Sequence, residues 1–165
     1  AIMKDIERIA DYMREHKLLL VTAESCTSGL IAATLADVPG TGELLDCAFV
    51  TYSVQAEQRC LKVNELTILR HNLTSEPVAR EMALGALTRS RANVAISNTG
   101  VVDDTDDEVP AGTQCFAWAF RSQSVPEGVA VVSATRRFTG DRVAIRRQSA
   151  EFALKQIPVY HAQHN

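Results

Sequence analysis

The stretch from Leu18 to Ala33 constrains the fold more than any other part of the chain. Its first residues, Leu18–Thr22, form an apolar run that predicts a buried strand, and the polar segment Glu24–Gly29 follows almost at once. A second apolar run with helical composition predicts a helix over Cys26–Ala36. A strand that passes into a helix through small hydroxyl residues is typical of the ligand-binding edge of α/β proteins, because N–H groups at a helix N-terminus can face a ligand. Ser25 lies at this turn.

Hydrophobic periodicity predicts the other elements. The first helix has an apolar face that consists of Ile2, Ile6, Ile9, Ala10 and Met13. Further helices are expected at Val54–Leu61, Glu65–Arg70, Glu76–Ser90 and from about Asp141 to Gln156, and further strands at Cys47–Tyr52, Val94–Ser97, Thr113–Arg121 and Gly128–Arg137. Alternation in the first part predicts parallel strands, and the last two strands predict an antiparallel pair. We therefore expect an α/β fold, a three-layer α/β/α sandwich with a mixed sheet, as a single domain over residues 1–165. The tail with His161 and His164 is expected to fray.

Composition excludes several classes of protein. The chain has 165 residues and a net charge of −3, its basic residues are scattered and its aromatic residues are few, so we expect no nucleic-acid partner. No apolar run approaches the roughly 20 residues that span a bilayer, and the N-terminal segment lacks the apolar centre of a signal peptide. We expect a cytoplasmic protein with no membrane partner and no cofactor. The cysteines lack CxxC spacing and predict buried reduced thiols rather than a metal site: Cys26, Cys47, Cys60 and Cys115.

Three polar segments are expected to meet at one edge of the sheet. Ser25, Tyr52-Ser53 and Asn98-Thr99-Gly100 each lie at the end of a predicted strand, and parallel strands end at the same edge, where ligands bind. Ser25 could act as a nucleophile if a base served it, or it could simply cap a helix. Instead of belonging to a site, Tyr52 could be a half-buried aromatic residue at a strand end.

Two charged segments flank this edge. Residues 103–108 contain five acids, which favour a solvated loop; the alternative is a cation site of oxygen ligands, but the spacing does not match a calcium loop, so no metal is expected. Asp141 is a suitable N-cap for the last helix. Arg142 lies in its first turn, where a cation opposes the helix dipole, so we expect it to contact an anion from a ligand or from a carboxylate.

Taken together, these segments resemble the CinA C-terminal family, whose active members are nicotinamide mononucleotide deamidases. The similarity extends from about Ile6 to Gln156. It rests on Thr22–Ala33 (TAESCTSGLIAA), Asp37–Gly40 (DVPG), Phe49–Ser53 (FVTYS), Ser75–Leu87 (SEPVAREMALGAL), Thr99–Gly100 (TG), Pro110–Thr113 (PAGT) and Phe138–Gln148 (FTGDRVAIRRQ). The resemblance implies a three-layer α/β/α fold and a homo-oligomer.

The resemblance also assigns roles to individual residues. Ser25 holds the place of the family's nucleophile, and Tyr52 matches a tyrosine of the site. Glu57 stands where active members have the lysine that serves the serine as a base. The ligand-binding positions implied by the family are Thr27, Gly29, Thr99, Gly100 and Arg142. A glycine-rich loop of the family is replaced here by the acids of residues 103–108. Lys62 is the nearest lysine that could substitute for the missing base.

These departures favour one hypothesis over two others. The first is a family member without activity on nicotinamide mononucleotide that still binds a small nucleotide-like ligand. The second is an active serine amidohydrolase with an altered substrate, for which a cationic or neutral amide would suit the acidic loop. The third is a non-enzymatic interaction module with a vestigial pocket.

Overall fold

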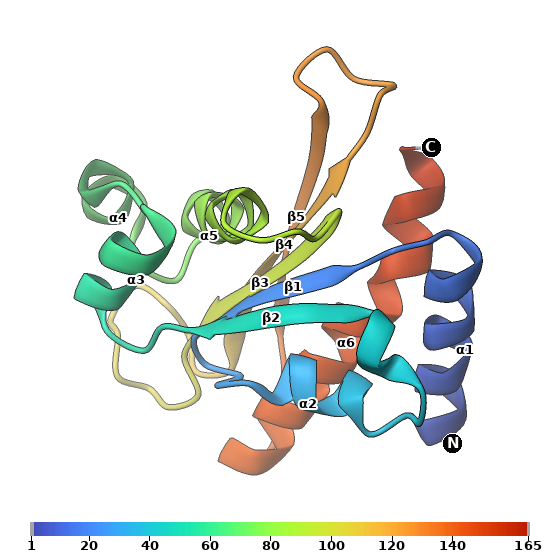
Figure 1. Ribbon diagram of the computed structural model, residues 1–165. Coiled ribbons are helices and arrows are strands. Elements are labelled where there is room, and N and C mark those ends of the chain that lie inside the picture. The colour runs from blue at the N-terminus through green and yellow to red at the C-terminus, as the bar shows by residue number, and fades with distance from the viewer. Residues whose placement is uncertain (1, 165) are drawn as a thin grey trace.

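The computed structural model describes residues 2–164, and its centre is a five-stranded mixed sheet (Figure 1). The strands are β1 (Leu20–Glu24), β2 (Leu45–Val50), β3 (Val94–Gly100), β4 (Thr113–Arg121) and β5 (Val129–Arg137), in the spatial order β2-β1-β3-β4-β5. β1 is parallel to both β2 and β3, whereas β4 is antiparallel to β3 and to β5. The predicted mixed sheet with a late hairpin is confirmed.

Helices cover both faces of the sheet, which makes the predicted three layers (Figure 1). On one face lie α1 (Ile2–Glu15), α2 (Leu30–Ala36) and α6 (Arg142–Gln163); on the other lie α3 (Val54–Leu61), α4 (Glu65–His71) and α5 (Glu76–Thr88), and a 3₁₀ turn, η1 (Thr41–Glu43), precedes β2. Within residues 2–164, no helix is both long enough and apolar enough to cross a membrane.

Alternation of large and small side chains along β4 sets the distance of each helical layer from the sheet. Phe116, Trp118 and Phe120 point towards α1, α2 and α6, while Cys115, Ala117 and Ala119 point towards α5. The small side chains allow α5 to pack close to the sheet. The aromatic side chains fill a thicker layer, where the Trp118 indole donates a hydrogen bond of 2.8 Å to the Ala153 carbonyl of α6.

The carboxyl ends of the parallel strands meet at one edge, as expected. Glu24, the last residue of β1, is paired with Val50 at the end of β2 and with Asn98 in β3. Ser25 and Tyr52 follow the ends of β1 and β2, and Thr99 continues β3 beyond Asn98. β1 begins and ends two residues later than predicted, and β2 begins and ends two residues earlier. The two strands pair from Leu20 with Leu45 onwards.

The prediction that a helix begins at Cys26 is wrong, because α2 begins only at Leu30. Ser28 and Gly29 have left-handed backbone conformations, with φ of 53° and 98°, and these conformations break any helix that would include them. Ser25 is consequently not the N-cap of α2, a position that Gly29 holds. The turn between β1 and α2 is held instead by hydrogen bonds to the Glu24 side chain.

The prediction of a frayed tail is also wrong. α6 continues through Pro158 to Gln163, and His161 is buried. The Tyr12 hydroxyl and His161 Nδ1 form a hydrogen bond of 2.7 Å, and the His164 carbonyl accepts a hydrogen bond of 3.0 Å from the Ser122 hydroxyl. These contacts with α1 and with the end of β4 hold the last turns of a helix that its proline would otherwise weaken.

Candidate functional site

The Glu24 carboxylate organises the turn that carries Ser25. Its two oxygens accept five hydrogen bonds of 2.8–3.1 Å: from the Thr22 and Thr27 hydroxyls and from the backbone N–H groups of Gly29, Ile31 and Ala32. The side chain is completely buried. These N–H groups belong to the start of α2, so they bind Glu24 and not a ligand. The expectation that the helix N-terminus faces a ligand is therefore wrong.

A second buried network fixes the turn from the side of β3. Ser25 N–H donates to the Asn98 carbonyl at 3.0 Å, and Thr27 N–H donates to Asn98 Oδ1 at 3.0 Å. The Asn98 amide in turn donates to Gln114 Oε1 at 2.8 Å, and the Gln114 amide lies 3.4 Å from Cys26 Sγ. Asn98 was expected to reach this edge but not to bind the Ser25 turn, and Gln114 was not expected in the site at all. Both are amides buried within strands of an apolar sheet, and that is the signal that could have identified them.

A pocket of about 230 Å³ opens beside Ser25 at this edge. It brings together four of the predicted site residues: Ser25, Tyr52, Gly100 and Arg142. The rest of its lining is Cys26, Leu73, Val101, Val102, Asp103 and Thr105. Ser25 is 9% exposed, whereas Tyr52 is 63% exposed and presents its ring to solvent. The tyrosine is thus not a half-buried core residue.

Three predicted ligand-binding residues support the pocket without lining it. The Thr27 hydroxyl donates to Glu24 Oε1 at 2.8 Å, and the Gly29 N–H donates to the same oxygen at 3.0 Å. The Thr99 side chain is buried, and its hydroxyl donates to the Leu73 carbonyl at 3.1 Å. These residues fix the turn after β1 and the segment that precedes α5.

Glu57 is enclosed in the protein and does not line the pocket. It lies in the first turn of α3, its side chain is fully buried, and neither carboxyl oxygen has a hydrogen-bond partner. Burial raises the pKa of Glu57 from 4.5 to about 7, because the charged form cannot be solvated. Lys62 is exposed at the C-terminal end of α3 and does not line the Ser25 pocket either.

The cationic and anionic walls of the pocket neutralise each other. Arg142 Nη2 lies 2.6 Å from Asp103 Oδ2, so the anion that Arg142 contacts is a carboxylate of the acidic loop. Arg146, one turn further along α6, donates to the Cys26 carbonyl at 3.0 Å and to the Thr27 carbonyl at 3.3 Å. The N-cap predicted at Asp141 is confirmed, since its side chain accepts a hydrogen bond of 2.8 Å from Ala144 N–H.

The acidic loop is ordered by local contacts. Asp106 accepts hydrogen bonds from the Asn72 amide at 3.0 Å and from Glu108 N–H at 2.8 Å, and the first of these lowers the pKa of Asp106 most. Asp104 and Asp107 are exposed. Between residues 2 and 164, no three histidine, cysteine, aspartate or glutamate side chains lie in a position to hold a metal ion together.

Cys26 is the other side chain with a reactive atom in the pocket. Burial raises the pKa of its thiol, and nearby arginines lower it to a smaller extent. The thiol is consequently protonated at neutral pH and is a poor nucleophile. Cys115 is also buried, while Cys47 and Cys60 are partly exposed, and all four cysteines are unpaired. The hydroxyl of Ser25 therefore remains the candidate nucleophile of this edge.

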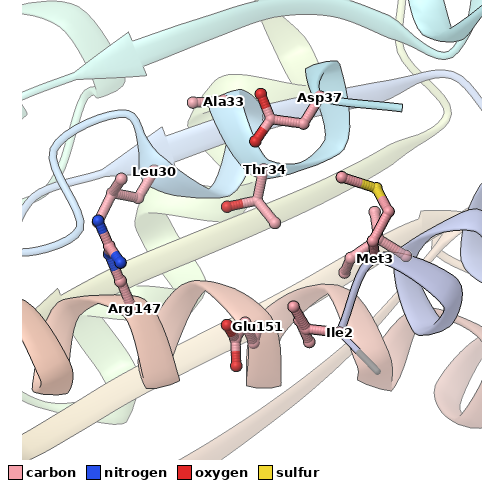
Figure 2. Close-up of a pocket in the computed structure, with 9 residues that line it drawn as sticks. Ile2, Met3, Leu30, Ala33, Thr34, Asp37, Arg147 and Glu151 are labelled. Carbon is pink, nitrogen blue, oxygen red and sulfur yellow. The ribbon is translucent and has the colours of Figure 1, made fainter. Parts of the chain in front are cut away.

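A larger hollow of about 320 Å³ lies among the helices of one outer layer and shares no residue with the Ser25 pocket. Figure 2 shows Ile2 and Met3 of α1 facing α2, with Arg147 and Glu151 rising from α6. Leu30, Ala33, Thr34 and Asp37 form the wall on α2. This hollow is the gap between α1, α2 and α6, and it holds none of the predicted catalytic residues.

Comparison with known proteins agrees with the fold. The model of the CinA C-terminal domain family matches residues 3–160. "Nicotinamide-nucleotide amidohydrolase PncC" of Escherichia coli K12 is 38% identical over 160 residues, which cover 94% of this chain and 92% of that protein. A "CinA-like protein" of Chlorobaculum tepidum is 40% identical over 93% of this chain and 36% of its own length.

Solved structures give the same result. The CinA superfamily protein KP700603 from Klebsiella pneumoniae superposes with a TM-score of 0.89 at 33% identity and covers 99% of both chains. A CinA superfamily protein from Escherichia coli gives a TM-score of 0.86, also at 33% identity, over 96% of this chain and 89% of its own. The expected relationship and fold are confirmed: the chain belongs to the CinA C-terminal domain family.

Proposed function

We propose that this protein has lost amidase activity on nicotinamide mononucleotide and that its Ser25 pocket still binds a small nucleotide-like ligand. The relatives named nicotinamide-nucleotide amidohydrolase support the ligand class. The pocket that Ser25, Tyr52 and Arg142 line supports retained binding. The loss of activity concerns the group that would activate Ser25.

The state of Glu57 is the observation that carries this proposal. A serine hydroxyl is barely ionised at neutral pH, so it needs a base within hydrogen-bond reach. The lysine that the family resemblance places at position 57 would accept the serine proton and then carry a positive charge beside the developing oxyanion. The Glu57 side chain is instead fully buried and outside the pocket lining, and its carboxyl oxygens have no hydrogen bond to Ser25 or to any other described residue.

The negative charge of a carboxylate at position 57 would slow amide hydrolysis further than the loss of the lysine alone. An ionised Glu57 would repel the negative charge that develops on the carbonyl oxygen during amide hydrolysis. Loss of one group that stabilises this charge lowers the rate by about 10²–10³. Loss of the nucleophile's base as well can lower the rate by up to about 10⁶-fold.

Glu57→Lys is expected to restore measurable ammonia release from nicotinamide mononucleotide, while the wild type stays at background. The gain should reach about 10²-fold over the wild type and should vanish when Ser25→Ala is added. The assay is ammonia release at high protein concentration and millimolar substrate. Glu57→Met is the matched control, because it gives position 57 a side chain of similar length without a base.

Two outcomes would overturn the proposal. One is ammonia release by the wild type that Ser25→Ala abolishes, since this shows a working enzyme with a different base. The other is a Glu57→Lys variant that melts as cooperatively as the wild type and still releases no more ammonia than Glu57→Met. If Glu57→Lys does not fold, the comparison of the wild type with Ser25→Ala decides the matter by itself.

A further inference from the structure

The ion pair between Arg142 and Asp103 lies within the lining of the Ser25 pocket. Among the described residues that line it, Arg142 is the cation and Asp103 is the anion. Their side chains are 54% and 59% exposed, so both can reach a ligand that enters. A ligand phosphate bound by Arg142 would have to lie beside the Asp103 carboxylate or displace it.

Among the described residues, no second cation lines the pocket to compensate. Arg146 is the nearest described candidate, because its guanidinium lies against the Ser25 turn. Its Nε and Nη2 atoms already donate to the Cys26 and Thr27 carbonyls. The loop that begins at Asp103 adds further negative charge from Asp104, Asp106, Asp107 and Glu108. The local field therefore opposes an anion and favours a cation.

The neutral part of the pocket fits an aromatic cation with hydroxyl groups. Tyr52 presents an exposed ring, and such a ring attracts a cation placed over its face. Ser25 and Thr105 supply hydroxyls, and Leu73 supplies apolar surface. The volume of about 230 Å³ lies below the roughly 300 Å³ at which typical ligand pockets begin, so a compact ligand is favoured over a full nucleotide.

We propose that the Ser25 pocket binds a cationic, nucleoside-like molecule without a phosphate, and that Asp103 is the residue that excludes the phosphate. This inference rests on the proposed function, in that the pocket still binds a small ligand. It adds the substrate class of that pocket and a residue that determines it. Asp103 acts by holding Arg142 and by repelling a second anion at the same place.

Two ligands that differ only in the phosphate test this inference. Nicotinamide riboside carries the cationic pyridinium ring and the ribose, and nicotinamide mononucleotide carries the phosphate in addition. Calorimetric titration of the wild type is expected to give a dissociation constant for the riboside at least about tenfold lower than for the mononucleotide. Raising the salt concentration from about 50 mM to about 500 mM should narrow this ratio, because the ion pair is half exposed.

Asp103→Asn removes the charge with little change of shape and should reduce the affinity ratio to about threefold or less. Asp104→Asn is the matched control: it removes the same charge from the next residue, which is exposed and does not line the pocket, and it should leave the ratio unchanged within about twofold. Melting curves of both variants establish that they are folded.

Any of three results would overturn the inference: equal or tighter binding of the mononucleotide by the wild type, an unchanged ratio in Asp103→Asn, or no binding of the riboside. Binding of neither molecule would overturn the retained binding proposed above together with this inference. Equal or tighter binding of the mononucleotide, or an unchanged ratio in Asp103→Asn, would overturn this inference alone. Loss of amidase activity is tested separately, by Ser25-dependent ammonia release.

Discussion

Glu24→Ala is expected to lower the free energy of unfolding by about 4 kcal/mol or more. The carboxylate is fully buried and accepts five hydrogen bonds, three of them from backbone N–H groups at the start of α2. Each buried donor left without a partner costs about 1–3 kcal/mol, and the loss of the side chain also leaves a cavity. Urea unfolding followed by circular dichroism measures the difference.

Glu7→Ala is the matched control for this change. Glu7 is an exposed glutamate of α1 with no described contact, so its replacement should change the free energy of unfolding by no more than about 0.5 kcal/mol. A loss of less than about 1 kcal/mol in Glu24→Ala would contradict the role of this carboxylate in holding the Ser25 turn.

Glu57→Gln is expected to stabilise the protein at pH 8 by about 3 kcal/mol and to leave its stability nearly unchanged at pH 4.5. Burial raises the pKa of Glu57 to about 7 in the folded protein, against 4.5 for the solvated side chain. The folded state thus binds this proton more tightly than the unfolded state. The stabilising contribution of the proton is complete below pH 4.5 and is lost as the pH rises to about 7. Glutamine resembles the protonated carboxyl at every pH.

The measurement is the difference in the free energy of unfolding between variant and wild type across this pH range. Taking the difference removes the titration of all other groups. Glu127→Gln, at an exposed position of the loop between β4 and β5, is the matched control and should change the free energy of unfolding by no more than about 0.5 kcal/mol. A flat difference for Glu57→Gln would show that the pKa of Glu57 is the same in the folded and unfolded states, which would contradict a buried carboxyl without a partner.

The sheet and its layers could be predicted from the sequence because their signals are local. Alternation of strands and helices predicted the parallel part, and a short connection between two apolar runs predicted the hairpin of β4 and β5. The tail could not be predicted in this way. Its helix depends on contacts with distant residues, such as the hydrogen bond between His161 and Tyr12, which are 149 positions apart.

The site was predictable in its position but not in its internal contacts. Strand ends correctly placed Ser25, Tyr52 and Gly100 at one pocket. The role of Glu24 was missed, because a carboxylate directly before a serine gives no sign that it folds back to bind the following helix. The partner of Arg142 was left open between a ligand and a carboxylate, and only the folded loop brings Asp103 to it.

The two buried glutamates of this edge have opposite surroundings. Glu24 is fully hydrogen-bonded and holds the turn that carries Ser25 in place. The carboxyl oxygens of Glu57 have no hydrogen-bond partner, and we propose that this residue replaces the base that Ser25 would need. This combination agrees with a pocket that still forms but lacks the proton acceptor for chemistry.

The most direct test of this account is ammonia release from nicotinamide mononucleotide by the wild type and by Ser25→Ala, with PncC from Escherichia coli as the active reference. The account predicts that the wild type and Ser25→Ala give the same background rate, even at high protein concentration and after long incubation. If the wild type releases ammonia and Ser25→Ala abolishes this release, the account is contradicted. Ser25 would then be activated by a base other than the residue at position 57.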